Sequence, residues 1–483
     1  MNFKMMGRFI SLIIAIEALF MLPALGISIG FRETLAVHAF LITIGVILIV
    51  SGILYLLCRK ANRLFGAREG LACVAVCWIV MSLLGALPFT LSGQVPRYID
   101  ALFEIVSGFT TTGSSVIANV EGLYRGILYW RSFSHWIGGM GVLVFLLAIV
   151  PGTKGAGFTM HLLRAESPGP DVGKLVPRMR QTALILYLIY VVLTVVNFLF
   201  LVFGNLDWLS ALCIAFGTAG TGGFGVANDS LASATPYVQN VTTIFMFLFG
   251  INFGFFYLLL LKQFRSAFRD EELRFYVGFA LLCVIALVFS IRPLYGTLSE
   301  TIRHAAFQVS SIMTTTGFAT TDFDQWPGFS KCILLVLMVI GACAGSTGGG
   351  LKCLRVLLLF KVLRRNIRQI MNPQKVLVIR SNDKVVDEKV LTNVNAYLAA
   401  YVIILILGTL LVSIDGFGLE TSLTAILATF NNIGPGLAAV GPTCTFANFS
   451  GFSKFIMIFC MLAGRLEIFP MLVLFSRGTW YRK

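Results

Sequence analysis

A short phrase that recurs four times limits what this chain can fold into more than any other feature. It reads Thr-Thr-Thr-Gly at residues 110–113 and again at 314–317. Altered copies stand at 220–222, where the sequence is Gly-Thr-Gly, and at 432–434, where it is Asn-Ile-Gly. Each copy ends a short apolar stretch that lies between two longer apolar runs. Because a repeat of fixed period marks a repeated structural unit, the chain is predicted to contain four related units.

The residues before the four glycines also align. Thirteen positions before each glycine the copies carry Asp100, Leu209, His304 and Thr421, and the next residue is small in every copy. Five positions after that start, each copy has a β-branched aliphatic residue: Ile105, Ile214, Val309 and Ile426. A single copy is equally compatible with a tight turn between packed helices. Four copies in register favour four loops that form the walls of one pore.

Composition places these units in a membrane. Hydrophobic residues make up 57% of the 483-residue chain and charged residues 12%, about half the charged fraction of a soluble domain. Apolar runs of about twenty residues, long enough to span a bilayer, occur repeatedly. The predicted fold is therefore an all-α polytopic membrane protein in which two N-terminal helices, near 9–30 and 35–58, precede four helix–pore-helix–helix repeats around one central pore.

The paired spanning helices of the repeats are predicted near 71–92 and 127–150, 182–203 and 238–261, 276–291 and 332–360, and 394–414 and 452–475. The corresponding segments are 1–68 for the two extra helices, then 69–180, 181–273, 274–390 and 391–483 for the four repeats. The apolar stretch at 100–109 is too short to span and is predicted to be a re-entrant pore helix, as are its three counterparts. Irregular backbone at membrane depth is tolerated only inside protein or along a water-filled cavity, which again favours a pore.

The positive charge of the chain, formally +15, is concentrated in alternate loops. Lys and Arg gather in residues 59–68, 154–180, 262–274 and 352–389, whereas the segments with the four phrases have very few. The positive-inside rule then predicts cytoplasmic basic loops, outward-facing phrases and cytoplasmic termini. The stretch 352–389 is richer than topology requires, so it could also dock a cytosolic partner or contact anionic lipid.

The residue types in the four phrases suit a cation path. Extended backbone can offer carbonyl oxygens in place of a water shell, and glycine lets the backbone approach the ion closely. The pore helices would direct their partly negative C-terminal ends at the cavity. The predicted filter residues are Thr111, Thr112, Gly113, Gly220, Thr221, Gly222, Thr315, Thr316, Gly317, Asn432, Ile433 and Gly434. Acidic residues predicted to concentrate cations at the outer mouth are Asp100, Glu104, Asp207, Asp229, Glu300, Asp322, Asp324, Asp415 and Glu420.

A second feature interrupts the last helix of the third unit. Five glycines fall within residues 341–350, and glycine opposes a regular helix by up to about 1 kcal/mol relative to alanine. The functional interpretation is a flexible loop below the filter that blocks or opens the pathway; the alternative is a glycine-rich packing surface between helices. The predicted gate residues here are Gly345, Ser346, Thr347, Gly348, Gly349, Gly350 and Lys352.

Arg465 is the third feature, because it stands inside the last apolar run. A charge at membrane depth is costly and usually functional, and its predicted partners are Glu467 or the carbonyls of the glycine-rich loop. A cation at the pore wall would also repel passing cations. The alternative is that the side chain snorkels to the interface.

These residues resemble the TrkH/TrkG branch of the TrkH/KtrB superfamily of bacterial potassium transporters over essentially the whole chain. The motifs that carry the resemblance are 110–113 (TTTG), 314–320 (TTTGFAT), 431–436 (NNIGPG), 138–141 (GGMG), 165–170 (AESPGP), 345–352 (GSTGGGLK) and 464–467 (GRLE).

The resemblance implies potassium uptake across the bacterial cytoplasmic (inner) membrane by a homodimer. It implies potassium binding by carbonyls beside Gly113, Gly222, Gly317 and Gly434, and a gate made of the glycine-rich loop and Arg465. Glycine rather than serine at 113 favours potassium over sodium. It also implies control by a separate cytosolic TrkA-like nucleotide-binding protein, since this chain has no nucleotide motif. No organic cofactor and no nucleic-acid partner are expected, and the second phrase (Ala219-Gly220-Thr221-Gly222) has extra glycines that leave its register open.

The function predicted is a gated, potassium-selective pore. The alternative is a potassium symporter coupled to protons or sodium, but such carriers usually keep intramembrane carboxylates, and only Glu17 and Glu467 qualify. An intramembrane enzyme would need a nucleophile paired with a base, and the sequence offers no such pair.

Overall fold

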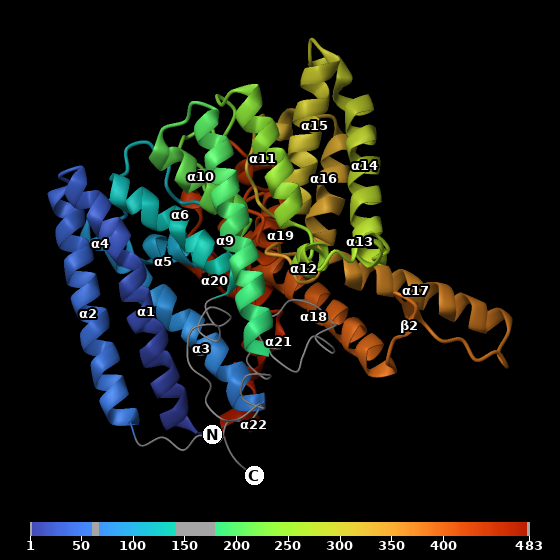
Figure 1. Ribbon diagram of the computed structural model, residues 1–483, viewed down its shortest axis with the longest axis horizontal. Coiled ribbons are helices and arrows are strands. Elements are labelled where there is room, and N and C mark those ends of the chain that lie inside the picture. Colours follow the sequence, from blue (N-terminus) through green and yellow to red (C-terminus); the bar gives the residue numbers. More distant parts are fainter. Residues whose placement is uncertain (1, 60–66, 142–178, 481–483) are drawn as a thin grey trace.

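Two long apolar helices begin the chain and pack along each other. The computed structural model describes residues 2–59, 67–141 and 179–480, and it begins with α1 (Phe3–Gly30) and α2 (Thr34–Cys58). α1 also contacts the first and last helices of the first repeat. The two helices therefore lie beside one repeat (Figure 1), as an addition to the four-repeat body.

The remaining helices form four repeats of the predicted kind, each with a long first helix, a short pore helix and a second helix. Repeat 1 has α3 (Ala67–Gly85), α4 (Leu87–Leu91), α5 (Tyr98–Phe109) and α6 (Arg125–Met140); repeat 2 has α9 (Met179–Phe203), α10 (Trp208–Gly220), α11 (Pro236–Phe249), α12 (Phe253–Leu260) and α13 (Phe264–Phe268). Repeat 3 has α14 (Glu271–Ile291), α15 (Leu298–Met313), α16 (Gly328–Ile340) and α17 (Cys353–Met371); repeat 4 has α18 (Glu388–Val412), α19 (Leu419–Phe430), α20 (Gly451–Arg465), α21 (Phe469–Phe475) and α22 (Arg477–Trp480).

Short elements complete the described chain. The 3₁₀ turns are η1 (Arg292–Leu294), η2 (Phe323–Gln325), η3 (Ser413–Asp415), η4 (Ala438–Val440) and η5 (Phe446–Asn448). The strands β1 (Arg380–Ser381) and β2 (Lys384–Val385) form an antiparallel hairpin between α17 and α18. The predicted all-α fold is confirmed.

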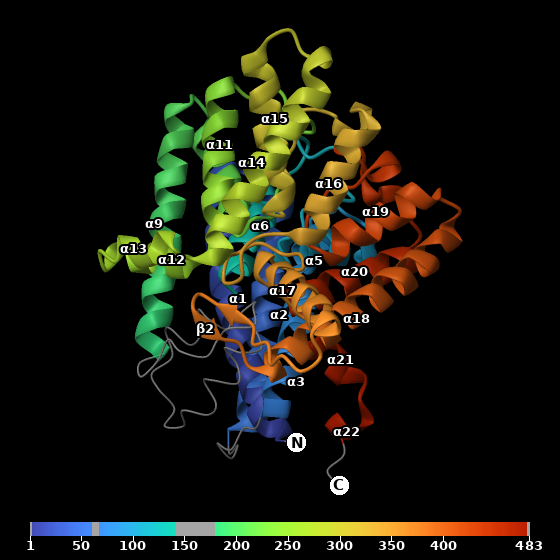
Figure 2. The same cartoon turned by 90° about the vertical axis from the view of Figure 1, so that its right-hand side faces the viewer.

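The repeats close into a ring. Every pore helix contacts the second helix of its own repeat and the second helix of one neighbouring repeat: α5 with α6 and α20, α10 with α11 and α6, α15 with α16 and α11, and α19 with α20 and α16. Every pore helix also contacts the first helix of its own repeat, namely α3, α9, α14 or α18. This cyclic pattern makes the four repeats equivalent around one axis, and Figure 2 shows the helices of repeats 2, 3 and 4 arranged side by side.

The second helices are interrupted. The glycine-rich run predicted this for the third repeat, where the loop separates α16 from α17, but continuous helices were predicted for the second and fourth repeats. There α11 and α12 meet at 88°, and a short break separates α20 from α21; in the first repeat α6 ends at Met140. The second helices pack closely against the pore helices. A Cβ on Gly138 or Gly464 would overlap the last carbonyl of the adjacent pore helix, at Phe109 or Phe430. Residues 142–150, at the end of the first predicted second helix, lie outside the described residues.

These breaks reduce the number of unbroken spans below the predicted ten. In the described residues, six helices are long and apolar enough to cross a membrane, and the bent pair α11–α12 makes a seventh. The segment boundaries predicted at 68/69, 180/181, 273/274 and 390/391 fall inside the first turn of α3, α9, α14 and α18. Each repeat therefore begins slightly earlier than predicted, because the basic and acidic residues before each apolar run are already helical.

The contact at Gly464 predicts that even alanine is poorly tolerated there. We expect Gly464→Ala to lower the free energy of unfolding by about 3 kcal/mol, since a backbone carbonyl cannot move aside as a flexible side chain can. Gly278→Ala is the control, because nothing lies within 4 Å of a Cβ in that exposed position of α14 and alanine should stabilise the helix by up to about 1 kcal/mol. Thermal unfolding of both purified variants measures the difference, and equal midpoints would contradict the packing argument.

Candidate functional site

The loops that follow the four pore helices share one backbone conformation. A residue just after each helix has a left-handed φ: Thr111 (56°), Thr221 (53°), Thr315 (59°) and Asn432 (56°). Two residues later a glycine again has a positive φ: Gly113 (84°), Gly223 (73°), Gly317 (86°) and Gly434 (105°). The residue between them donates its N–H to a carbonyl five residues back, at 2.8–2.9 Å, in Thr112, Gly222, Thr316 and Ile433. The four loops, which we call the filter loops, are thus structurally equivalent.

This equivalence corrects the register of the second loop. The sequence alignment paired Gly222 with Gly113, but the backbone pairs Gly223 with Gly113, Gly222 with Thr112 and Thr221 with Thr111. Gly220 then corresponds to Thr110. The alignment failed because three neighbouring glycines offered two matches, and only the backbone angle distinguishes them.

The filter loops interlock. A Cβ on Gly113 would overlap the carbonyl oxygen of Gly222, one on Gly223 would overlap that of Thr316, and one on Gly317 would overlap that of Ile433. The ring closes at Gly434, whose Cβ would lie 3.0 Å from the carbonyl oxygen of Thr112. The glycine of each repeat thus lies against a backbone carbonyl of the next repeat, so the predicted filter residues of all four repeats meet at one axis.

The loops are strained and held from behind. A left-handed φ is a true outlier for a β-branched residue, and such strain persists only where the surroundings fix it. Thr110 and Thr112 share a hydrogen bond of 2.8 Å between their hydroxyls, and Thr314 and Thr316 share one of 2.7 Å. Asn432 reaches from repeat 4 to the Thr112 hydroxyl at 2.9 Å. The threonine side chains therefore point into protein rather than toward the axis.

A buried ion pair supports the first two filter loops. Arg131 Nε lies 2.6 Å from Glu104 Oε1, and both side chains are almost fully buried. Glu104 also accepts hydrogen bonds from Ser115 and from the Val116 amide, just past the first filter loop. Arg131 donates to the Gly225 carbonyl at 3.0 Å and stacks on Phe224, just past the second loop. Through these bonds the buried pair connects the first repeat to the second.

His135 lies one helical turn after Arg131 and also connects the first and second repeats by hydrogen bonds. Its Nδ1 lies 2.8 Å from the Gly108 carbonyl, and its Nε2 accepts from the Phe224 amide at 3.3 Å. A Cβ on Gly222 would overlap the imidazole ring. The sequence analysis missed Arg131 and His135; the signal that could have found them is a pair of polar residues four apart within an apolar helix.

The predicted acidic mouth is only partly free to attract cations. Glu104 is neutralised by Arg131, Asp100 pairs with Lys454 at 2.6 Å, and Asp324 pairs with Lys331 at 2.8 Å. Partial burial raises the pKa of Asp324, but hydrogen bonds from Lys331 and the Ala438 amide outweigh burial and leave the pKa below its usual value. These carboxylates connect repeats at the outer surface, so the prediction that all nine serve as a free acidic mouth is wrong for these three.

The glycine-rich loop between Ile340 and Cys353 lies directly behind the third and fourth filter loops, as predicted. The Gly349 amide donates to the Thr315 hydroxyl at 2.6 Å. A Cβ on Gly349 would overlap the Asn431 carbonyl, and one on Gly348 would lie 2.7 Å from the Thr314 carbonyl. Nearly all residues of the loop are buried. We call this segment, residues 341–352, the intramembrane loop.

Arg465 joins the intramembrane loop to the first repeat. It donates to the Thr347 carbonyl at 2.8 Å, to the Gly139 carbonyl at 2.7 Å and to the Thr111 hydroxyl at 3.3 Å, and it also bonds the Gly138 carbonyl. One of its carbonyl partners, Thr347, belongs to the glycine-rich loop as expected from the sequence, whereas Gly138 and Gly139 of α6 were not expected. Glu467, the other expected partner, instead pairs with Arg355 at the start of α17.

Two further charged residues hold the intramembrane loop. Lys352, itself buried, donates to the Gly348 carbonyl within the loop. Glu272, in the first turn of α14, accepts from the Ala344 amide at 2.6 Å and from the Leu354 amide at 3.0 Å. A single carboxylate thus holds both ends of the loop. The sequence analysis missed Glu272 because its partners are backbone amides far along the chain, which leave no sequence pattern.

Comparison with known proteins identifies the family. The family model named TrkH, described as a cation transport protein, matches residues 36–479. The chain belongs to the TrkH family. Its relatives include the Trk system potassium uptake protein TrkH of Escherichia coli (strain K12), which is 36% identical over 99% of this chain and 100% of its own length. TrkG of the same organism is 32% identical over 96% of each chain.

A solved structure agrees with this assignment. The crystal structure of the potassium transporter TrkH from Vibrio parahaemolyticus matches with a TM-score of 0.88 at 29% identity and covers 100% of both chains. The TrkH family consists of membrane transport proteins rather than enzymes, so this chain is a membrane transport protein. The motif at 165–170 that contributed to the resemblance lies outside the described residues.

The Glu104–Arg131 pair predicts a large effect of removing one partner. Arg131→Met leaves a buried, unpaired carboxylate, so we expect the free energy of unfolding to fall by about 3–5 kcal/mol. The double variant Glu104→Gln/Arg131→Met should recover part of this loss. Lys331→Met, which breaks the more exposed pair with Asp324, is the control and should cost less than about 1 kcal/mol. Thermal unfolding of the four proteins checks the order, and an equal loss in both single variants would contradict it.

Proposed function

We propose that this protein takes up potassium across the bacterial cytoplasmic membrane through a gated, potassium-selective pore. The observation that carries the proposal is the ring of four interlocked filter loops, in which backbone carbonyls from all four repeats meet at one axis. The names of the relatives, which are potassium uptake proteins, support the choice of ion.

Ion selection would follow from the backbone of the filter loops. The carbonyls of Thr112, Gly222, Thr316 and Ile433 precede the four positive-φ glycines, so they are the oxygens best placed to replace the water shell of a cation. The pore helices α5, α10, α15 and α19 end at the loops, and their partly negative C-terminal ends favour a cation there. Because every threonine hydroxyl described above is bonded within protein, the carbonyls rather than the hydroxyls would set the selectivity.

The intramembrane loop would act as the gate. It packs against the inner side of two filter loops, and Arg465, Lys352 and Arg355 bring positive charge to the same region. Glu467 pairs with Arg355, and Glu272 accepts from the backbone amides of Ala344 in the loop and Leu354 just after it. A buried loop with clustered cations opposes the passage of another cation both sterically and electrostatically, and the loop would have to leave its hydrogen bonds for the pathway to open.

The orientation proposed for the chain rests on its charge distribution, and the proposed partners rest on its resemblance to the TrkH/KtrB superfamily. Both termini would be cytoplasmic, because Lys and Arg are concentrated in the loops that alternate with the segments carrying the filter loops, and basic loops stay on the cytoplasmic side. A homodimer and a cytosolic TrkA-like nucleotide-binding regulator are proposed as partners. Such a regulator would act on the gate from the cytoplasm, where α17 leaves the intramembrane loop.

Gly113→Ser tests the filter. A side chain at this position would displace the Gly222 carbonyl. We therefore expect potassium flux to fall at least about tenfold, which corresponds to a loss of about 1.4 kcal/mol or more in the interaction of the ion with the coordinating oxygens. The preference for potassium over sodium should also shrink. Gly416→Ser is the matched control, since Gly416 also has a positive φ (82°) but is exposed, with nothing within 4 Å of a Cβ. Flux of potassium, rubidium and sodium into proteoliposomes is the measurement.

The same assay separates the pore from the coupled carrier. Potassium flux that follows its own gradient and ignores imposed sodium and proton gradients supports the pore. Uptake that requires either gradient would support the symporter instead. Unchanged selectivity in a folded Gly113→Ser protein would argue against the filter loops as the selective element.

Glu272→Gln tests the gate. The amide keeps the shape of the carboxylate but loses its charge, so the bonds to Ala344 and Leu354 weaken. We expect potassium flux in the absence of any partner protein to rise about tenfold, which corresponds to a loss of about 1.4 kcal/mol in the stability of the closed loop. Glu271→Gln, one residue earlier in the same helical turn, is the control, because Glu271 pairs with Lys361 outside the loop. Equal flux in both variants would show that Glu272 does not hold the gate closed.

A further inference from the structure

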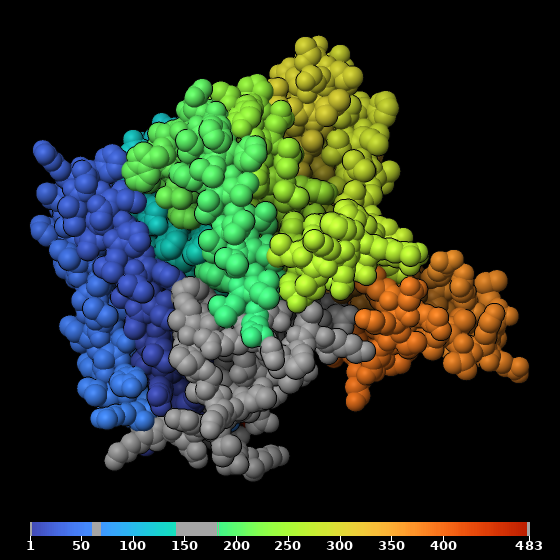
Figure 3. Space-filling view, in the orientation of Figure 1, coloured from blue at the N-terminus to red at the C-terminus, as the bar shows by residue number. Residues whose placement is uncertain are grey.

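Glu17, one of the two intramembrane carboxylates in the sequence, takes part in none of the ion pairs or loop contacts described so far. It stands near the middle of α1, a helix of 28 residues that is apolar enough to cross a membrane. Glu17 is only 1% exposed, although α1 and α2 form one edge of the molecule (blue in Figure 3). Because α1 packs against α3 and α6 as well as α2, a carboxyl so well enclosed lies between helices rather than in the lipid.

The carboxyl of Glu17 lies where α1 meets the end of α3 and the last turns of the pore helix α5. A Cβ on Gly85, the last residue of α3, would lie 2.8 Å from Glu17 Oε1. The same Cβ would lie 3.0 Å from the ring of Phe109 and 3.2 Å from Ile105 Cγ1. The Gly85 carbonyl already accepts from Trp130 Nε1 of α6 at 3.1 Å, and the Trp130 ring packs edge-on against Phe109. The carboxyl therefore faces apolar side chains of the first repeat.

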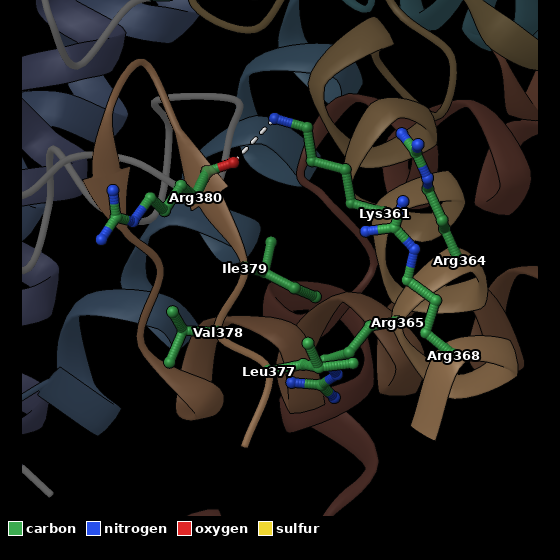
Figure 4. A pocket seen from close by; sticks show the side chains of 8 residues that line it. All are labelled: Lys361, Arg364, Arg365, Arg368, Leu377, Val378, Ile379 and Arg380. Atoms are coloured by element: carbon green, nitrogen blue, oxygen red, sulfur yellow. Dashed lines mark hydrogen bonds between the residues drawn. The ribbon is translucent and has the colours of Figure 1, made fainter. Parts of the chain in front are cut away.

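Other charged side chains are paired or lie at the surface. Glu104, which is as deeply buried as Glu17, pairs with Arg131. The basic side chains of α17 line a pocket at the outside of the molecule (Figure 4). Within residues 2–59, 67–141 and 179–480, by contrast, neither oxygen of Glu17 has a hydrogen-bond partner, and Glu17 forms no ion pair.

We propose that Glu17 is a proton-binding site inside the membrane, and that its neutral carboxyl is the site where an apolar carbodiimide modifies and inhibits the protein. An ionised carboxylate in apolar surroundings needs an opposite charge or several hydrogen bonds, and without them the group takes up a proton instead. A metal cation would need several oxygen ligands, which the side chains of Ile105 and Phe109 do not offer. The proton is therefore the ligand that these surroundings fit.

The reaction with a carbodiimide depends on the proton of the acid. The proton moves to one carbodiimide nitrogen while a carboxyl oxygen bonds to the central carbon. The acyl carbon then transfers from that oxygen to the other nitrogen, which leaves a stable N-acylurea, and no group is lost at either step. Glu104 is the internal control, because it is equally buried but held as a carboxylate by Arg131. The reagent dissolves in the bilayer, and α1 lies at the edge of the molecule.

Labelling tests the site in the full chain reconstituted in lipid vesicles. After treatment with dicyclohexylcarbodiimide at neutral pH, peptide mass spectrometry should find the N-acylurea on Glu17 and not on Glu104. A cationic, water-soluble carbodiimide should leave Glu17 unmodified. An unmodified Glu17 after the apolar reagent, or equal modification of Glu104, would overturn the proposal.

Infrared spectroscopy tests the proton without any need for the reagent to enter. The variant E17Q, a neutral replacement of the same shape, should lose a carbonyl band of a protonated carboxyl relative to the parent. E467Q is the control and should lose a carboxylate band instead, because Glu467 pairs with Arg355. Loss of a carboxylate band in E17Q would show that Glu17 is ionised and would overturn the proton site.

Inhibition is the one part of the inference that rests on the proposed function. An adduct on Glu17 has no room against Gly85 and would displace Phe109 at the end of the first pore helix. Dicyclohexylcarbodiimide should therefore lower potassium flux in the parent and leave flux in E17Q unchanged. Equal inhibition of both proteins would overturn Glu17 as the inhibitory site. Labelling and infrared spectra involve no transport, so a failure of the proposed function would leave their outcomes intact.

Discussion

The structure depends on a space that no side chain can occupy. Where the four filter loops meet, each glycine lies against the carbonyl of the next repeat, and for three of the four a Cβ would overlap that carbonyl. This contact brings four backbones together at one axis, and it requires the left-handed angles of the residues before each glycine. Everything around the ring serves to keep strained backbone in place: threonine hydroxyls bond to one another, Asn432 crosses to Thr112, and His135 and Arg131 connect the first two loops.

Charged groups fix the ring from both sides by different means. On the outer side, Glu104, Asp100 and Asp324 each form an ion pair with a basic residue, and these pairs connect repeats instead of remaining free at the mouth. On the inner side, Arg465 and Glu272 bond mainly to backbone groups, of which Thr347 and Ala344 belong to the intramembrane loop. The Glu104–Arg131 pair is buried beside the ring, whereas hydrogen bonds to the backbone of a loop can be exchanged for others. This difference supports the proposal that the ring selects the ion and the loop moves.

The intramembrane loop also connects the axis to the surface. α17 begins directly after it at Cys353, and Glu272 accepts from the amide of Leu354 in the first turn of that helix. Arg355, in the first turn of α17, pairs with Glu467 from the break between α20 and α21. One helix, α17, therefore joins the intramembrane loop to the β1–β2 hairpin at the outside of the molecule.

The sequence by itself determined the membrane class, the four repeats, the glycine-rich interruption and most residues at the axis, because hydropathy, a fixed period and a run of glycines are local properties of the chain. Tertiary structure alone decided the register of the second loop, where three neighbouring glycines were indistinguishable until Gly223 took the positive φ. It also decided the breaks in the second helices of the second and fourth repeats, the choice of Thr347 over Glu467 as a partner of Arg465, and the contacts of Glu272, Arg131 and His135. Those features arise from contacts between segments far apart in the chain, where a backbone carbonyl or amide is the partner and leaves no trace in the order of residues.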